Sequence, residues 1–247
     1  MNERAPVKRL IDVSKWQDPK LFDWDRLGEN FVGVIMRSTY GCLRDKRVEE
    51  FFRLVRRNAF TAGLYHFFRI KRGPGEQLEA FNATAEAVGL GPGDLVPTVD
   101  VESIPQGRGP NGELRFLHPD PSWCAPLRVL VDCLVERWGD CMIYLNANDY
   151  HRLGAPEWLH LRPLWFAHWT RGKRITLPGW PATLWQHWTK LTPELEGAYP
   201  RGVDQNIALG PLPLIPSTRY GEAMTSRILA MAALTAYESA RGTYRGR

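Results

Sequence analysis

The sequence predicts an α/β protein in which eight buried strands close into a barrel that helices cover on part of its circumference. Eight short apolar runs are spread along the chain, and helical patterns alternate with the early ones. The last three runs follow one another with little helix between them. This alternation indicates strands with helices packed outside them, and eight strands of buried type are typical of a closed barrel. At 247 residues the chain is long enough for one large domain of this kind.

The strands are predicted from apolar runs bounded by polar residues, Gly or Pro. In chain order they are Leu10–Ser14, Phe31–Arg37, Ala62–Phe68, Leu95–Glu102, Cys141–Leu145, Pro163–Trp169, Ala182–Trp188 and Gly202–Ala208. Apolar residues at helical spacing predict helices over 46–59, 76–88 and 122–138. Gly89 and Gly139 follow the second and third of these helices, at the place where a glycine commonly ends a helix.

One predicted strand carries two acids at its end. In Leu95-Val-Pro-Thr-Val-Asp-Val-Glu-Ser103, Asp100 and Glu102 are two positions apart, so they point to one face, roughly 7 Å apart along the strand. Residues 104–121 are rich in Gly, Pro, Asn and Arg and predict a long loop directly after Glu102. Spacing alone leaves two interpretations open, a functional pair or solvated side chains where a strand meets a loop.

The positions of four acids decide between these interpretations. Asp12, Asp100 and Glu102 lie at or near the carboxyl ends of predicted strands one and four, and Asp204 lies within strand eight. In closed barrels of this class the chemistry takes place at the carboxyl ends of the strands. Scattered surface acids would not be placed this way, so the sequence predicts a functional site.

The composition restricts the class of protein further. Hydrophobic residues make up 44% and charged residues 24%, which is ordinary for a globular protein. The net charge of +5 suggests anionic surroundings, either nucleic acid or an acidic cell-wall polymer. Because the basic residues are dispersed, no nucleic-acid-binding stripe is predicted. The four Cys have no metal-ligand spacing, so neither a metal nor another cofactor is expected. No run approaches the length of a membrane span, so stable membrane insertion is not expected.

The end of the chain is predicted to be separate from the barrel. Residues 1–211 form the predicted barrel domain, 212–220 a stiff proline-rich linker, and 221–247 an amphipathic C-terminal helix. A helix with one apolar stripe either docks on its own barrel, which is the favoured interpretation, or binds a partner.

Several short motifs follow one another along residues 9–210. They are Ile11-Asp-Val-Ser-Lys-Trp-Gln17, Arg37-Ser-Thr-Tyr-Gly41, Gly63-Leu-Tyr-His-Phe67, Val99-Asp-Val-Glu102, Ile143-Tyr144, Leu164-Trp-Phe-Ala-His-Trp169, Trp185-Gln186 and Val203-Asp204. In this order and spacing they resemble glycoside hydrolase family 25, the Chalaropsis-type lysozymes or N-acetylmuramidases, many of which bacteriophages encode. Any one motif is weak, and the order of all of them carries the resemblance.

The resemblance implies an irregular TIM-like (β/α) barrel of five strand-helix units followed by three strands. By motif, the acids of the family correspond to Asp12, Asp100, Glu102 and Asp204. Two positions depart from the family pattern. Tyr40 stands where the family often has an acid, and Gln205 stands where an apolar residue is usual.

The four acids are expected to divide the catalytic work. Hydrolysis of a glycosidic bond needs an acid for the leaving oxygen and negative charge to stabilise the transition state. Glu102 is the expected acid, because burial and repulsion from Asp100 raise a carboxyl pKa. Asp100 is expected to stay ionised and to orient the substrate's N-acetyl group or a water, while Asp12 and Asp204 hold Asp100 and the sugar by hydrogen bonds. Both an inverting and a substrate-assisted reaction stay open.

Aromatic and amide side chains complete the predicted site. Flat aromatic faces pack on sugar rings, so the candidate platform residues are Tyr65, Tyr144, Trp165 and Trp169. Barrel core is the alternative for each of them, and for Trp165 neither interpretation is favoured. Gln186 is a candidate for a hydrogen bond to a sugar hydroxyl, and Asn206 is the last candidate substrate-binding residue.

The sequence therefore predicts a lysozyme that cleaves the β-1,4 bond between N-acetylmuramic acid and N-acetylglucosamine in bacterial peptidoglycan. The alternatives are a glycosidase acting on another N-acetylated polymer and a wall-binding or structural module of a virion. The N-terminus has no apolar stretch of signal-peptide length. The expected location is the host cytoplasm followed by release to the wall, as for a phage lysin, or the virion itself.

Overall fold

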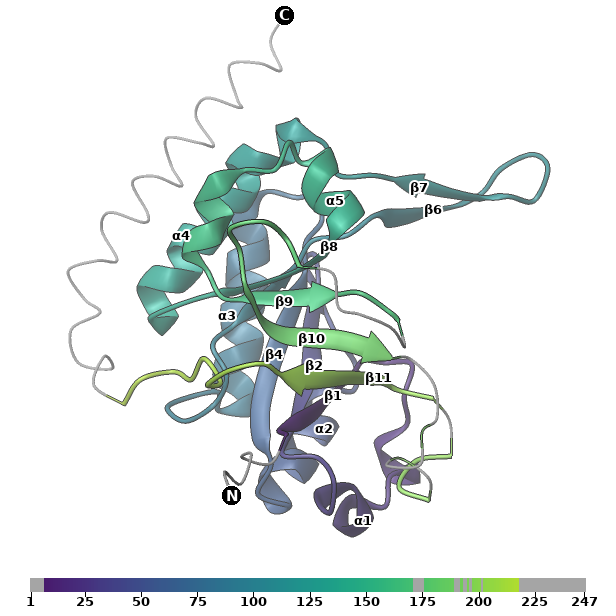
Figure 1. Ribbon diagram of the computed structural model, residues 1–247, viewed down its shortest axis with the longest axis vertical. Helices are drawn as coiled ribbons and strands as arrows, with labels where there is room; N and C mark the ends of the chain where they lie inside the picture. The colour runs from purple at the N-terminus through teal and green to yellow at the C-terminus, as the bar shows by residue number, and fades with distance from the viewer. Residues whose placement is uncertain are drawn as a thin grey trace, which may run out of the picture.

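A closed barrel of eight strands forms the centre of the computed structural model, within the part of the chain that it describes (Figure 1). That part comprises residues 7–170, 176–188, 192, 195, 197–200 and 202–217. The barrel strands are β1 (Arg9–Val13), β2 (Gly33–Tyr40), β4 (Thr61–Phe67), β5 (Thr98–Asp100), β8 (Met142–Asn146), β9 (Leu164–Ala167), β10 (Ala182–Trp188) and β11 (Asp204–Ala208). They pair in this order, and β1 closes the sheet by pairing with both β2 and β11.

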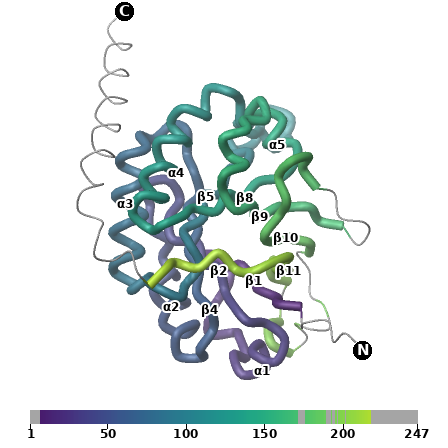
Figure 2. The backbone as a smooth tube through the Cα atoms, turned by 60° about the vertical axis from the view of Figure 1, so that its left-hand side comes forward, coloured from purple at the N-terminus to yellow at the C-terminus, as the bar shows by residue number. Residues whose placement is uncertain are grey.

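An α-helix follows each of the first five barrel strands. These helices are α1 (Trp24–Gly28), α2 (Val48–Arg57), α3 (Pro74–Val88), α4 (Cys124–Trp138) and α5 (Ala147–Arg152). Helices α2, α3 and α4 lie side by side along one side of the barrel, where Figure 2 shows them together. In the described chain, no α-helix separates β9, β10 and β11. The predicted order of five strand-helix units followed by three strands is therefore confirmed.

Shorter elements fill the connections. They are the 3-10 helices η1 (Pro19–Leu21), η2 (Pro121–Trp123) and η3 (Glu157–Leu161), and the two-residue strand β3 (Leu43–Arg44), which extends the sheet beside β2. None of the helices among the described residues combines the length and the apolar character that a membrane crossing requires.

Amphipathic spacing explains why the longer helices form and how they pack. All four apolar residues that predict the first helix, from Val48 to Val55, are buried in the core. Gly89 ends α3 with φ of +78°, and Gly139 ends α4 with φ of +90°. Residues with a Cβ rarely adopt such angles, so a glycine at each place lets the chain turn back toward the next strand.

The direction of the last strand has a consequence for the acids. The first seven barrel strands run parallel to their neighbours, whereas β11 is antiparallel to both β10 and β1. The first residue of β11, Asp204, therefore pairs with Asp12 near the end of β1. An acid at the start of this strand reaches the same end of the barrel as acids at the ends of the others.

The strand with two acids is shorter than predicted. β5 ends at Asp100, and Glu102 lies two residues beyond it. Pro97 has no N–H to donate to a sheet ladder, which explains why the regular strand begins only after it. Leu95 forms an isolated bridge with Leu214. Val101 N donates to Tyr144 O at 2.9 Å, so the backbone is still held by β8 directly before Glu102.

Residues 104–121 are not a plain loop, contrary to the prediction. β6 (Ile104–Arg108) and β7 (Leu114–Leu117) pair antiparallel as a hairpin that projects from the molecule (Figure 1). The turn contains Asn111-Gly112, a dipeptide typical of tight turns between strands. The hairpin begins only two residues after Glu102, so it stands beside the predicted site.

The described part of the C-terminal segment contacts the barrel. Val96 N donates to Pro213 O at 2.9 Å, and Ile215 N donates to Asp94 O at 2.7 Å. The segment predicted as a stiff linker is thus bonded to the barrel over Pro213–Ile215. The predicted C-terminal helix over 221–247 lies outside the described residues.

Candidate active site

A cleft opens where the acids meet, at the carboxyl end of the parallel strands. The open space within it, including the mouth, is about 320 Å³. The residues that line it are Asp12, Tyr65, Asp100, Glu102, Tyr144, Trp165, Gln186 and Asp204. The structure therefore brings all four predicted acids together, along with most of the predicted substrate-binding residues.

Asp12 lies on the floor of the cleft between two amides. Its Oδ2 accepts a hydrogen bond from Gln186 Nε2 at 2.9 Å and another from Asn206 Nδ2 at 2.8 Å. Burial raises the pKa of Asp12 to about 6, although these two bonds lower it. The arrangement holds one carboxylate oxygen firmly in place.

Both amides are themselves held by aromatic side chains. Gln186 Oε1 accepts from Tyr144 OH at 2.8 Å and from Trp169 Nε1 at 2.9 Å. Asn206 Oδ1 accepts from Trp165 Nε1 at 2.7 Å. The geometry therefore places Gln186 and Asn206 as supports of Asp12, whereas the sequence suggested contact with a sugar.

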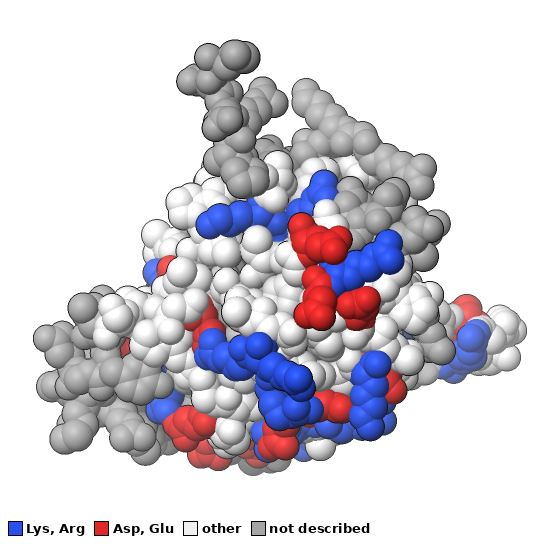
Figure 3. Space-filling view, turned by 90° about the horizontal axis from the view of Figure 1, so that it is seen from below, with Lys and Arg blue, Asp and Glu red and all other residues white. Residues whose placement is uncertain are grey.

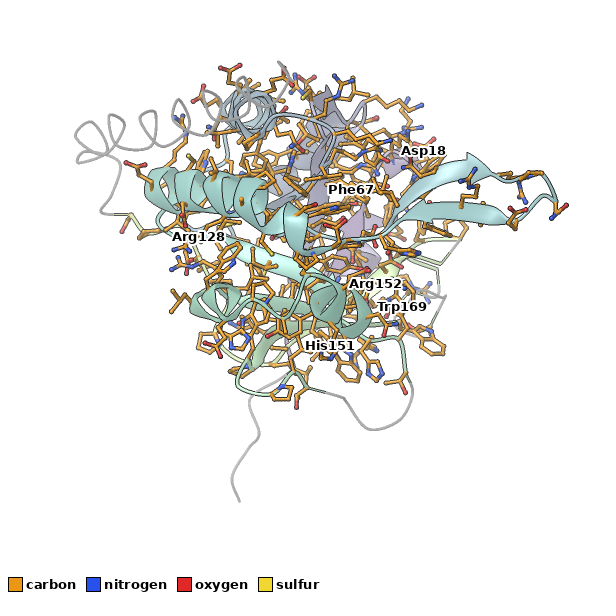
Figure 4. The ribbon with its side chains drawn as sticks, turned by 90° about the horizontal axis from the view of Figure 1, so that it is seen from above. Asp18, Phe67, Arg128, His151, Arg152 and Trp169 are labelled. Carbon is orange, nitrogen blue, oxygen red and sulfur yellow. The ribbon has the colours of Figure 1, made fainter. Side chains whose placement is uncertain are left out.

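The predicted aromatic platform separates into a buried part and an exposed part. Trp165 is only 2% exposed, yet it lines the cleft with its edge against Tyr144 and Tyr65, so it belongs to the core and the site at once. Trp169 is 61% exposed and lies beyond the end of β9, outside the cleft lining. Its bond to Gln186 keeps it at the rim. In Figure 4, it lies on the side of the molecule from which the hairpin projects.

Asp100 is buried and lacks one partner. Its Oδ1 has no hydrogen bond within the described structure. Burial, followed by the charges of Glu102 and Asp12, raises the pKa of Asp100 well above its usual value, although Arg37 lowers it. This desolvation favours the protonated form of Asp100 in the free protein and so opposes the ionised form that its predicted role requires.

Glu102 and Asp204 also have raised pKa values. Burial, followed by the charges of Asp149 and Asp12, raises the pKa of Glu102 to about 7. Burial, followed by Asp12 and Glu102, raises the pKa of Asp204 to about 8. The predicted rise for Glu102 is confirmed in direction, but the main charge behind it is Asp149. The hydrogen bond predicted between Asp12 and Asp100 is not present among the described residues, and the charge of Asp12 instead raises the pKa of Asp100 by repulsion.

Asp149 is the residue that sequence reasoning missed. It lies on α5, is 2% exposed, and accepts bonds from the backbone N–H and the hydroxyl of Ser103, the residue after Glu102. A signal for it is present in the sequence. Asn146 and Asp149 have the spacing of a helix-capping pair directly after a predicted strand, and Asn146 Oδ1 does accept from Asp149 N at 2.9 Å.

The two positions that depart from the family pattern have local partners. Tyr40 lies under the guanidinium of Arg69, which also donates to its hydroxyl. Gln205 is buried, and its Oε1 accepts from Thr192 Oγ1 at 3.1 Å. Neither departure alters the cleft lining. In the described ranges, no group of three or more His, Cys, Asp or Glu side chains has the arrangement of a metal site.

Charge on the outer surface is mixed. On the face seen in Figure 3, Lys and Arg side chains form several separate groups with Asp and Glu between them. The described basic residues on this face are therefore dispersed, as they are in the sequence.

Comparisons with known proteins identify relatives of this barrel. The family model described as glycosyl hydrolases family 25 matches residues 11–193. A search among curated proteins finds no match. Among solved structures, a bacterial lysozyme from Streptomyces coelicolor is 21% identical, with a TM-score of 0.68, and the match covers 84% of this chain and 94% of that one.

Two further structures share the fold. The catalytic domain of an endolysin from a bacteriophage of Listeria monocytogenes is 20% identical, with a TM-score of 0.62, over 83% of this chain and 95% of that one. A modular autolysin from Streptococcus pneumoniae in complex with a synthetic peptidoglycan ligand is 14% identical, with a TM-score of 0.65, over 81% of this chain and 46% of that one.

Proposed function

The chain belongs to glycosyl hydrolases family 25, and on this premise we propose that it is a lysozyme that hydrolyses bacterial peptidoglycan. The bond that we propose it cleaves is the β-1,4 linkage between N-acetylmuramic acid and N-acetylglucosamine. One observation carries the proposal: four carboxyl groups meet in one cleft. The pKa of Glu102, which burial raises to about 7, supports it. The similar lysozyme, and the autolysin whose structure holds a peptidoglycan ligand, support the substrate class.

Glu102 has the role of general acid in this proposal. A glycosidic oxygen leaves as an alcohol only when it receives a proton, and the donor must hold that proton near the working pH. A carboxyl with a pKa of about 7 is largely protonated in mildly acidic solution, whereas an ordinary Glu is not. Glu102 also lies just beyond the strand end, at the mouth of the barrel.

Asp100 has the role of orienting the group that attacks the sugar carbon. Its Oδ1 is a buried acceptor without a partner, and leaving such an atom unpaired is unfavourable. The acetamido N–H of a bound N-acetylated sugar, or a water molecule, supplies the missing donor. This match between an unpaired acceptor and the substrate class supports the choice of an N-acetylated polymer.

Asp12 and Asp204 form a second pair of acids in the cleft, and Asp12, with its pKa of about 6, is the one that supplies negative charge near neutral pH. They face each other across the β1–β11 pair, and the charge of Asp12 raises the pKa of Asp204. We propose that this pair stabilises the positive charge that develops on the sugar ring and binds its hydroxyls. Tyr65, Trp165 and Trp169 supply apolar surface for the rings.

The stereochemical outcome separates two reactions that these roles permit. If Asp100 orients the acetamide so that its oxygen attacks, the first product keeps the β configuration. If it orients a water, the first product is the α-anomer. Proton NMR of the earliest product distinguishes them, and a first-formed α-anomer would rule out the substrate-assisted reaction.

Mass analysis of digested peptidoglycan tests the proposed function. The expected products are muropeptides with N-acetylmuramic acid at the reducing end. Products that end in N-acetylglucosamine would contradict the assignment of the bond. Chitin oligomers, incubated in parallel, are the matched control, because they contain the same linkage without muramic acid. Faster cleavage of chitin than of peptidoglycan would contradict the substrate.

We also propose that the enzyme is encoded by a bacteriophage and acts on the wall either after release from the host cytoplasm or from the virion. The motif resemblance and the similar endolysin catalytic domain support this origin. Immunoblotting of purified virions and of infected-cell lysates separates the two locations. Repeating the immunoblot with a chain truncated after residue 217 tests whether residues 221–247 bind a virion partner. If they do, the truncated chain should be missing from the particles.

A further inference from the structure

Asp149 is a buried carboxylate that does not line the cleft. Each of its oxygens accepts two hydrogen bonds. Oδ1 accepts from Ser103 Oγ at 2.8 Å and from Arg152 Nη1 at 3.1 Å. Oδ2 accepts from Asn146 Nδ2 at 2.8 Å and from Ser103 N at 3.3 Å. A buried acid with four donors is fixed in one position, because each lost bond would leave a buried polar group unpaired.

The contacts of Asp149 with Ser103 help to hold the backbone next to Glu102. Glu102 lies outside the regular strand, so the sheet ladder does not fix its backbone. On one side, Val101 N is bonded to Tyr144 O of β8 at 2.9 Å. On the other side, Ser103 is bonded to Asp149 through both its backbone N–H and its hydroxyl. Glu102 is therefore held between two bonded neighbours, and Asp149 supplies the bonds on the side that faces the hairpin.

We propose that Asp149 is a positioning residue for hydrolysis: by holding Ser103 it fixes the backbone from which Glu102 reaches the scissile bond. The inference rests on the proposed role of Glu102 as the acid. Asp149 is outside the cleft lining, so we assign it a positioning role and not contact with the substrate. Its action passes through Ser103 and through its charge.

Arg152 connects the same cluster to the hairpin. Its Nη1 donates to Asp149 Oδ1, and it lies 3.0 Å from Nδ1 of His118, the residue after β7. His118 Nδ1 is also 2.8 Å from Ser103 Oγ. Figure 4 shows Arg152 on the side of the molecule from which the hairpin projects. Both ends of the hairpin are thereby tied to the backbone next to Glu102.

The charged groups around Glu102 come from several elements. Asp149 on α5, Asp12 on β1, Asp100 on β5 and Asp204 on β11 are acidic, and Arg37 on β2 is the cation that opposes them. The phenols of Tyr65 on β4 and Tyr144 on β8 complete the surroundings, and burial raises the pKa of each well above its usual value, so both are neutral. Within this set, Arg152 contacts Asp149 alone among the acids.

Because of this contact, substitutions of Asp149 and of Arg152 should shift the pKa of Glu102 in opposite directions. The negative charge of Asp149 favours protonated Glu102, so Asp149→Asn lowers the pKa of Glu102, and the alkaline limb of kcat against pH moves to lower pH, by about one unit. Arg152→Gln leaves the charge of Asp149 without its cation, so the same limb moves to higher pH. If Asp149 had only a structural role, the two substitutions would not shift this limb in opposite directions.

The rate constants supply the second part of the test. We expect Asp149→Asn to lower kcat on peptidoglycan by roughly ten- to a hundredfold, with KM changed less than threefold, because a displaced acid weakens the chemical step more than binding. Ser103→Ala removes one of the two Ser103 bonds and should lower kcat less. Arg152 is partly exposed, so Arg152→Gln tests the charge effect even if Asp149→Asn folds poorly. Glu79→Gln, on the exposed surface of α3, is the control.

Carbon-13 NMR of the Glu102 carboxyl separates this inference from the proposed function. The titration needs no substrate, so it reports on Asp149 even if peptidoglycan is not cleaved. A pKa of Glu102 that falls in Asp149→Asn and rises in Arg152→Gln supports the inference. An unchanged pKa in both folded variants, or a kcat loss that matches only a loss of folded protein, overturns it. Failure of the wild type to cleave peptidoglycan, with these shifts present, would contradict the proposed function alone.

Discussion

The floor of the cleft and its rim are held in place by different means. On the floor, Asp12, Asp100 and Asp204 lie on strands that pair with neighbours on both sides, so sheet register sets their positions. On the rim, Glu102 and Trp169 lie beyond strand ends and depend on side-chain hydrogen bonds. The barrel itself thus fixes the positions of the three floor acids, whereas hydrogen bonds from a few loop residues fix the positions of Glu102 and Trp169.

The largest predicted effect comes from the floor. Asp100→Asn removes the carboxyl that is proposed to orient the attacking group, so kcat on peptidoglycan should fall about a hundredfold or more. The melting temperature should hold or rise, because a buried acid without a full set of partners opposes folding. Turbidity of a wall suspension and thermal unfolding measure the two effects. A kcat within threefold of the wild type would show that the floor does not take part in the chemistry.

The next effect concerns the residue that connects floor and rim. Gln186→Leu removes an amide bond to Asp12 and leaves Tyr144 OH and Trp169 Nε1 without their acceptor. The free energy of unfolding should fall by about 1–3 kcal/mol. Denaturant titration measures it, with the exposed Gln106→Leu in the hairpin as the matched control. Equal stability of the two variants would mean that floor and rim are not connected through Gln186.

Stability against pH distinguishes the floor from ordinary surface acids. The folded pKa of Asp204 is about 8, above the value of an unfolded Asp, so the folded protein binds more protons between about pH 4 and 8. Its contribution therefore weakens the folded state as pH rises through that range. Asp204→Asn should raise the melting temperature at pH 8 and change it little at pH 4.

Calorimetry at both pH values checks this prediction, with Glu79→Gln as a control on an exposed surface. An Asp204→Asn variant that melts below the wild type at pH 8 would contradict the raised pKa. It would also show that Asp204 is held by favourable bonds and is not kept in an unfavourable position for function.

The smallest effect comes from the far rim. Phe116 on β7 is 42% exposed and stacks on His118. Phe116→Ser should change stability by less than about 0.5 kcal/mol, as is usual for surface substitutions, and should raise KM for polymeric peptidoglycan a few-fold if the hairpin contacts the glycan. Phe116→Tyr keeps the ring and is the control. A fall in kcat with KM unchanged would instead show that the hairpin, like the floor, affects the chemical step.

The floor could be predicted from the sequence because strands have a fixed period. Alternation places Asp100 on the opposite face from Val99 and Val101, and this interpretation needs only the local sequence. The position of Asp204 depended on the direction of β11, which local pattern does not reveal. Asp204 could be assigned to the site only because the motif Val203-Asp204 stands in the order typical of the family.

The rim could not be predicted in the same way, because its contacts join residues far apart in the chain. Asp149 and Ser103 are separated by 46 positions, and the capping spacing of Asn146 and Asp149 predicts the start of a helix but not this contact. The role of Gln186 and Asn206 as supports of Asp12 follows from burial and bonding that only the folded barrel defines. The hairpin had a readable signal in Asn111-Gly112, but a loop rich in Gly and Pro obscured it.

The most direct measurement compares wild type and Glu102→Gln on purified peptidoglycan by counting new reducing ends, with circular dichroism to confirm equal folding. Glutamine is close to glutamic acid in shape but cannot donate the proton, so the rate should fall by about 10²- to 10⁴-fold while the spectrum stays unchanged. A folded Glu102→Gln enzyme with more than a tenth of the wild-type rate would contradict the account, because the proton would then have to come from another group.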